Sequence, residues 1–302
     1  MSIIKTVNYF LFDVLKCILY IIALLPLGVL YILGDIIYYP LYYIVKYRRR
    51  VVRKNLISSY PDKSLEEIVD LEKKFYHHFC NYMMETLKLI SISDKEMKKR
   101  FVYKNLGELE NIVSDGKPVF LMMGHYGNWE WVTSLTVQVP KSIFMAQIYS
   151  PLKNEAADRF MYKLRARFHS LGIARNQTLR EILRLKAEGK QLMVGFIADQ
   201  RPSRKNLHLW TDFLNHDTPC LIGTEKIARK IDANVLFLDV KCTKRGYYEG
   251  KFKVISLDSK NTPELYITTK YMQELETTIN FAPQYWLWSH DRWKYNKEDL
   301  KQ

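Results

Sequence analysis

A histidine and a glutamate five residues apart, His125 and Glu130, are the pair of side chains in this sequence best suited to acid–base chemistry. They stand in the segment GHYGNWE, residues 124–130. On a continuous α-helix five residues rotate by about 140°, so the two side chains would diverge. They can meet only if His125 lies on a turn and Glu130 on the first turns of a following helix. Gly127 and Asn128 permit such a turn, and Asn128 can cap the helix.

The chemistry that such a pair performs is proton transfer. A carboxylate that holds one imidazole nitrogen leaves the other nitrogen free as a general base. Because no serine or cysteine nucleophile accompanies the pair, we expect direct transfer, in which His125 takes a proton from a substrate hydroxyl that attacks an activated acyl carbonyl. The alternative is a hydrogen-bonded histidine at a sheet edge and a solvated Glu130, and spacing alone does not choose between the two.

Short apolar runs that alternate with helical patterns supply the elements that would position this pair. A buried strand is expected at residues 118–124, directly before His125, and similar runs occur at 142–148, 191–198 and 234–240. Helices are expected at 129–137, 153–171, 178–188 and 223–230, and a capping box at Ser64–Glu67 opens another that ends near Ile90. The pattern predicts an α/β fold with a largely parallel sheet flanked by helices, whose active sites collect at the carboxyl ends of the strands.

The N-terminal residues have the composition of a membrane element. Residues 17–34 carry no formal charge and span about 27 Å as a helix, close to the thickness of the hydrocarbon core. The sequence allows this segment to span straight, to kink at Pro26 or to re-enter. A tyrosine-rich apolar stretch at 36–45 and the basic run KYRRRVVRK at 46–54 follow. A cleaved signal peptide and a buried soluble helix are the alternatives, but aromatic and basic flanks favour an anchor whose basic end stays in the cytoplasm. We therefore expect a membrane anchor with a basic juxtamembrane segment at residues 1–50 and a catalytic α/β domain at 51–302.

The net charge of +14 implies an anionic partner, which charge alone does not identify as membrane, acidic protein, phosphorylated lipid or nucleic acid. No nucleic-acid-binding motif is present, so we expect no nucleic-acid partner. The four cysteines have no paired spacing, and His77 and His78 point about 100° apart on a helix. We therefore expect no disulfide framework, no metal site and no cofactor.

The GHYGNWE segment resembles the HX4(D/E) motif of lysophospholipid-type acyltransferases, and its Asn-Trp-Glu version resembles that of the lipid A biosynthesis late (lauroyl/myristoyl) acyltransferases. The likeness extends over nearly the whole chain. It includes YRRRVVRKNL at 47–56, Asn154 with Arg165 and Arg167, Ala198-Asp199-Gln200 with Arg204 and Lys205, Thr218-Pro219 with Gly223-Thr224, and APQYWLWSHDRWK at 282–294. Two departures, the apolar turn at 220–222 and Asp291 in place of a basic residue, bear on acceptor recognition.

The resemblance implies transfer of a fatty-acyl chain from acyl carrier protein to a hydroxyl of a lipid A precursor, at the cytoplasmic face of the bacterial inner membrane. It implies His125 as base, Glu130 as its partner, and Arg165 near the acyl carbonyl or an acceptor phosphate. The basic surface suits an acidic carrier protein and an anionic lipid acceptor. The residues expected to bind substrate are Asn128, Arg165, Arg167, Asp199, Arg204 and Lys205.

Three other functions compete with this one. An acyltransferase acting on a lysophospholipid, ornithine lipid or glycolipid would carry the same catalytic pair. A non-catalytic lipid-binding protein would keep the fold without consuming an acyl donor. A membrane-tethered nucleic-acid binder has only the charge in its favour. Asp199 on its own has two interpretations, one as a residue that orients the acceptor or a catalytic arginine, the other as a turn residue or helix cap.

Overall fold

The computed structural model describes residues 3–207, 209–295 and 297; the side chains of residues 3–13 and of Lys205 are not described. In this part of the chain a seven-stranded sheet has the order β1-β9-β8-β2-β5-β3-β4, and a separate pair, β6 and β7, is antiparallel. All neighbours in the large sheet are parallel except β8 and β9. The expected α/β fold with a largely parallel sheet is therefore confirmed. The strands are β1 (Phe101–Tyr103), β2 (Val119–Met123), β3 (Ile143–Tyr149), β4 (Leu171–Ala174), β5 (Gln191–Ile197), β6 (Leu209–Phe213), β7 (His216–Cys220), β8 (Asn234–Lys244) and β9 (Tyr247–Ser256).

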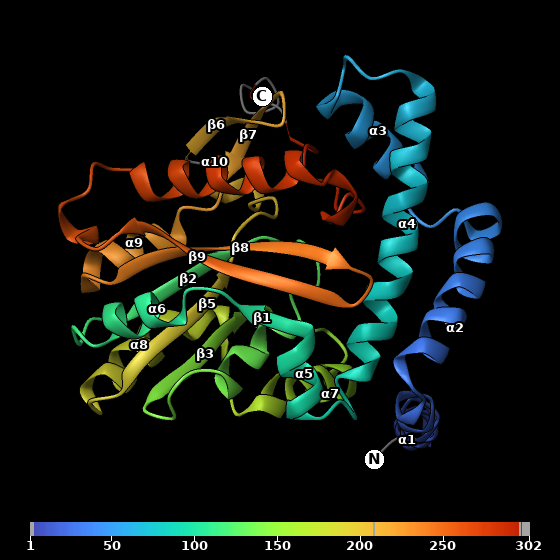
Figure 1. The fold of residues 1–302 in the computed structure, drawn as a ribbon, viewed down its shortest axis with the longest axis horizontal. Helices are drawn as coiled ribbons and strands as arrows, with labels where there is room; N and C mark the ends of the chain where they lie inside the picture. Colours follow the sequence, from blue (N-terminus) through green and yellow to red (C-terminus); the bar gives the residue numbers. More distant parts are fainter. Residues whose placement is uncertain (1–2, 208, 296, 298–302) are drawn as a thin grey trace.

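The four expected strands form the centre of the sheet as β2, β3, β5 and β8. Every residue of β2 is buried, as a parallel strand covered on both faces requires. Helices cover the two faces in Figure 1, with α10 running along one side of the sheet and α5 and α7 on the opposite side. The helices beyond residue 48 are α3 (Arg49–Ser59), α4 (Leu65–Lys88), α5 (Asp94–Arg100), α6 (Leu106–Val113), α7 (Glu155–Arg165), α8 (Thr178–Ala187), α9 (Gly223–Ile231) and α10 (Tyr266–Phe281). Short 3₁₀ helices are η2 (Trp131–Val137), η3 (Ala166–Phe168), η4 (Arg175–Gln177), η5 (Arg204–Asn206), η6 (Ser259–Asn261) and η7 (Pro283–Tyr285).

Two expected helices differ in detail from those observed. Residues 131–137 form the 3₁₀ helix η2 in place of an α-helix. The hydroxyls of Thr133 and Thr136 bond the carbonyls three residues before them and so compete with the backbone N–H groups for these acceptors. The helix expected at 153–171 ends earlier, since His169 adopts a left-handed conformation with φ of 66° and β4 begins at Leu171. The capping box of α4 is as predicted, with Ser64 and Glu67 each accepting from the other's backbone N–H.

The N-terminal apolar segment is divided at Pro26. Helix α1 (Ile3–Leu24) ends before this proline and α2 (Leu27–Tyr39) begins after it, because proline lacks the N–H that a continuous helix needs. Of the arrangements that the sequence allows for residues 17–34, the structure therefore has the one interrupted at Pro26. A π-helix, η1 (Pro40–Val45), extends α2, and together Leu27–Val45 is long and apolar enough to cross a membrane by length and composition, with a mean hydropathy of 1.4.

One face of α2 packs along α4, as Figure 1 also shows. At Gly34 a Cβ atom would lie 3.3 Å from the Met84 side chain, so the two helices approach closely. The ring of Tyr38 stacks on His77 with centroids 3.6 Å apart. The opposite face of α2 and η1 is apolar and exposed, with Ile36 of α2 59% exposed and Ile44 of η1 77% exposed.

Three arginines of the basic run at residues 46–54 form hydrogen bonds with other parts of the fold. Arg48 donates to the carbonyl of Ser289 at 2.8 Å. Arg49 and Arg53 both bond the carboxylate of Glu72, which is fully buried on α4. These three arginines therefore fasten the chain that follows η1 onto α4 and onto the C-terminal segment.

Candidate active site

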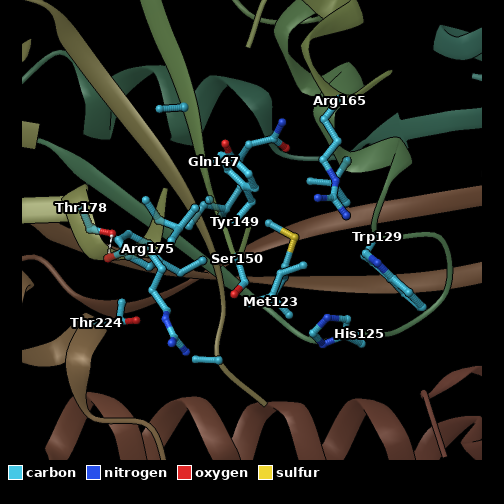
Figure 2. Close-up of a pocket in the computed structure, with 18 of the residues that line it drawn as sticks. Met123, His125, Trp129, Gln147, Tyr149, Ser150, Arg165, Arg175, Thr178 and Thr224 are labelled. Carbon is cyan, nitrogen blue, oxygen red and sulfur yellow. Dashed lines mark hydrogen bonds between the residues drawn. The ribbon is translucent and has the colours of Figure 1, made fainter. Parts of the chain in front are cut away.

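A cavity of about 470 Å³ opens where β2, β3 and β5 end (Figure 2). Successive side chains of a strand point to opposite faces of its sheet. Because the adjacent residues Gln147 and Ile148 of β3 both line the cavity, it extends around the carboxyl edge of the sheet onto both faces. Gly195 lies on a central strand yet is partly exposed, which shows that the cavity reaches the sheet itself.

His125 lies two residues beyond the end of β2 and lines this cavity. Its Nδ1 is 2.6 Å from Oδ1 of Asp199, which follows β5 and is 2% exposed. The second oxygen, Oδ2, accepts from the backbone N–H of His125 at 2.8 Å and from the indole N–H of Trp286 at 2.9 Å. A carboxylate so placed favours the tautomer with its proton on Nδ1, which leaves Nε2 as a proton acceptor. The side-chain amide of Gln200 lies 3.3 Å from Nε2.

Asp199 is ionised at all physiological pH values. Burial alone would raise its pKa, but the charge of His125 and the hydrogen bonds from His125 and Trp286 outweigh burial and lower the pKa to about 2. A permanent negative charge against Nδ1 stabilises the imidazolium that forms when Nε2 takes a proton.

The expectation that Glu130 holds the imidazole of His125 is wrong. Glu130 is 3% exposed and binds the guanidinium of Arg165 through two hydrogen bonds, 2.8 Å from Nε and 2.6 Å from Nη2. Among the described contacts of His125, the carboxylate is that of Asp199, 74 residues away in sequence. Glu130 and Arg165 nevertheless line the same cavity as His125, so the motif brings both to one site. Planar, two-point pairing of this kind fixes a guanidinium in position.

The turn that carries His125 is fixed by the C-terminal segment and by α4. Gly127 has φ of 61°, a conformation that glycine adopts without strain, and its N–H donates to the carbonyl of Tyr285 at 2.9 Å. The N–H of Leu287 donates to the carbonyl of His125 at 3.1 Å. A Cβ atom at Gly124, directly after β2, would lie 2.5 Å from the end of the Leu275 side chain on α10, so a larger residue would force Leu275 to shift.

The buried side chain of Asn128 stabilises the turn through hydrogen bonds. It is fully buried and does not line the cavity. Its amide donates to Glu85 at 2.7 Å, and its oxygen accepts from the backbone N–H of Trp131, the first residue of η2, at 3.1 Å. Glu85 also accepts from the hydroxyls of Tyr31 at 2.9 Å and Tyr248 at 2.7 Å, and burial raises the pKa of its carboxyl. This group of hydrogen bonds connects α2 to the turn of the motif.

The remaining predicted binding residues are not all brought together. Arg165 and His125 face the cavity, whereas Arg167 turns away and bonds the carbonyls of Ile90 and Ile92 after α4. Arg204 lies in η5, outside the cavity lining, and the side chain of Lys205 lies outside the described residues.

Sequence reasoning missed three residues of the site. Trp286 and Gln200 both stand in segments that the sequence singles out, but their bonds to Asp199 and His125 depend on chain crossings that sequence does not reveal. Arg175 carries no sequence signal beyond its charge, and it lines the cavity wall opposite Arg165 in Figure 2. Within the described residues, no group of three His, Cys, Asp or Glu side chains is arranged to hold a metal ion.

Fold and site together define an α/β protein with a histidine–carboxylate pair in a cavity, an arrangement typical of general-base enzymes. The comparison with protein families is more specific. The model of the bacterial lipid A biosynthesis acyltransferases matches residues 4–295, nearly the whole chain. The chain therefore belongs to this family and is an acyltransferase. A search of the curated proteins finds no match.

Proposed function

We propose that this enzyme transfers a fatty-acyl chain from an acyl carrier-protein thioester to a hydroxyl of a lipid A precursor. The observation that carries the proposal is His125 on the wall of a cavity with room for an acyl chain, with the buried carboxylate of Asp199 bonded to its Nδ1. Family membership supports a lipid hydroxyl as acceptor and an activated acyl group as donor. The net charge of +14 suits an acidic carrier protein and an anionic acceptor.

In the proposed reaction the acceptor hydroxyl donates its proton to Nε2 of His125 while its oxygen attacks the thioester carbonyl carbon. Asp199 stabilises the imidazolium, as its position against Nδ1 allows. The tetrahedral intermediate then expels the thiol: the carbon–sulfur bond breaks, and the proton passes from Nε2 to the sulfur. We assign Arg165, fixed by Glu130, to stabilising the negative charge on the former carbonyl oxygen.

The surroundings of Nε2 support direct transfer, without a covalent acyl-enzyme. Among the described residues, neither Cys220 nor Cys242 lines the cavity, and no hydroxyl side chain is hydrogen-bonded to His125. A serine or cysteine nucleophile would need that contact to be activated. The acceptor hydroxyl therefore takes the place beside Nε2.

We further propose that the exposed face of α2 and η1 lies in the bilayer. The opposite face of α2 packs against α4, so the apolar side chains of the exposed face have no partner within the described part of the chain. Lys46, Arg50 and Lys54 are exposed beside it and suit anionic headgroups. In this arrangement residues 1–50 form the membrane-associated part, and the α/β domain at 51–302 works at the cytoplasmic face of the bacterial inner membrane.

The test is acyl transfer in detergent micelles, from a labelled acyl carrier-protein thioester to a tetra-acylated, sugar-extended lipid A precursor. A labelled penta-acyl product is expected with the wild type and little with His125→Ala. If the folded wild type acylates other lipids of a total bacterial extract and not this precursor, the acceptor is a lysophospholipid, an ornithine lipid or a glycolipid. If it consumes no donor with any lipid, the proposal is refuted.

A further inference from the structure

The cavity has a second polar wall that the proposed chemistry does not use. Figure 2 shows Arg175, Thr178 and Thr224 on the side away from Arg165 and His125. These residues come from η4, α8 and the start of α9. The Thr178 hydroxyl donates to the carbonyl of Arg175 at 2.9 Å and so fixes the turn from which this arginine extends.

Among the described residues, Arg175 differs from the other arginines of the cavity in having no carboxylate as an ion-pair partner. Arg165 is paired with Glu130 at 2.6 Å, and Arg201 lies 3.7 Å from a carboxylate oxygen of Asp291. The described ion pairs and side-chain hydrogen bonds include none for the guanidinium of Arg175, although it lines the cavity. Its positive charge is therefore available to a ligand.

Thr224 is a second unsatisfied group on this wall. It is 7% exposed and lines the cavity, yet among the described hydrogen bonds its hydroxyl has no partner. A threonine hydroxyl both donates and accepts, so one that faces a cavity without a protein partner is able to bond a ligand or water there.

The backbone adds donors at the same place. Helix α9 begins at Gly223, and no side chain caps it. The N–H of Lys226 is the first to bond back, to the carbonyl of Ile222, so the amides of Gly223 and Thr224 precede the helical ladder. Free amides at a helix N-terminus, together with the helix dipole, attract anions.

The one carboxylate in the first turn of α9 faces away from the cavity. Oε2 of Glu225 accepts from the backbone N–H and the hydroxyl of Thr268, at 2.9 Å and 2.6 Å. Glu225 is therefore turned onto α10 and is not part of the cavity lining.

We propose that Arg175, Thr224 and the amides at the start of α9 form a subsite for a phosphate group of one of the two substrates. A phosphate presents several oxygens, which suits one guanidinium, one hydroxyl and backbone amides converging from different elements. The subsite deepens the proposed function, on which it rests: it positions an anionic substrate on the wall opposite the catalytic pair. The phosphate belongs either to the acceptor headgroup or to the phosphodiester of the donor's prosthetic arm.

The experiment compares Arg175→Ala and Thr224→Val with the wild type. Arg180→Ala is the matched control, because Arg180 is an exposed arginine on α8 that does not line the cavity. KM is measured for each substrate with the other saturating. A second readout is the broadening of the ³¹P signal of inorganic phosphate by each protein, with thermal melts to confirm folding.

We expect Arg175→Ala to raise one KM about tenfold or more while kcat changes less than about twofold, and Thr224→Val to raise the same KM less. A raised acceptor KM, absent with a dephosphorylated acceptor, assigns the subsite to the headgroup; a raised donor KM assigns it to the prosthetic arm. Phosphate broadening should fall in both variants and persist in Arg180→Ala. Unchanged KM values and unchanged broadening in both folded variants would overturn the subsite. If the wild type transfers no acyl chain, the broadening still decides for or against the subsite.

Discussion

Replacing Asp199 with asparagine should abolish most of the activity while the fold survives. Oδ2 of Asp199 accepts from two N–H groups, the His125 backbone and the Trp286 indole, so the amide oxygen of asparagine must occupy that position. The amide nitrogen then faces Nδ1 of His125 in place of Oδ1, 2.6 Å away in the wild type. Because an amide nitrogen donates, Nδ1 must become the acceptor and the imidazole proton must move to Nε2. An Nε2 that already carries a proton cannot accept one from the acceptor hydroxyl.

The size of the effect follows from this wrong tautomer and from the lost charge. We expect kcat to fall by about 10³ to 10⁴, which corresponds to about 4–5 kcal/mol of transition-state stabilisation. The stability cost is smaller. Lowering the pKa of a fully buried carboxyl from 3.8 to about 2 contributes on the order of 2 kcal/mol to folding. The pKa is depressed in the folded state, so this contribution is present above about pH 4 and is lost as the pH falls towards 2.

The assay is steady-state acyl transfer with Asp199→Asn and Glu130→Gln in parallel, each checked by urea denaturation at neutral pH. Glu130→Gln keeps an oxygen acceptor for Arg165 and leaves the His125 tautomer alone, so we expect a loss of kcat at least tenfold smaller than that of Asp199→Asn. An Asp199→Asn enzyme that keeps more than a tenth of the wild-type kcat would refute the assignment. So would a Glu130→Gln loss as large as that of Asp199→Asn with stability unchanged.

Three further predictions concern the pairs and networks around the site. Glu130→Ala leaves the guanidinium of Arg165 without its buried carboxylate and should lower the free energy of unfolding by about 2–4 kcal/mol in urea melts, and a stability equal to the wild type would contradict the importance of the pair. Burial raises the pKa of Glu85 and favours its neutral form, so Glu85→Gln should lower the free energy of unfolding by less than about 1.5 kcal/mol. Glu85→Ala removes the hydrogen-bonding group and should lower it by about 3 kcal/mol or more. Equal losses in the two variants would indicate a charged carboxylate. Burial lowers the pKa of His78 to about 4, so the imidazole binds a proton more readily in the unfolded chain than in the folded one. The free energy of unfolding should therefore fall by about 3 kcal/mol from this residue as the pH drops from about 6.5 to 4. The same pH series with His78→Gln should be flatter over this range, and a parallel pair of curves would contradict the assignment.

The central strands could be predicted from the sequence because they are buried on both faces and read as continuous apolar runs, as in β2. Strand β9 alternates charged residues such as Lys251 and Lys253 with apolar ones, and β1 has only three residues, so neither produces such a run. Helix α10 contains threonine pairs at 268–269 and 277–278, which weaken a helical signal that tertiary packing then overrides.

The sequence predicts the local part of the candidate site but not the contacts that depend on how the strands pair. The motif placed His125, Glu130 and, through the resemblance, Arg165 in one region, and the cavity lining contains all three. Which carboxylate holds the imidazole depends on the packing of β5 beside β2, whose register aligns Met123 with Ile197 and so brings the two strand ends together. Five residues of local spacing favoured Glu130, but the paired strand ends place Asp199 closer.

The most direct test of the account is transfer from a labelled acyl carrier-protein thioester to the lipid A precursor by the wild type, His125→Ala and Asp199→Asn, with all three shown to be folded. We expect labelled product with the wild type and a rate lower by about 10³ or more in both variants. Transfer by His125→Ala at a rate near that of the wild type would contradict it.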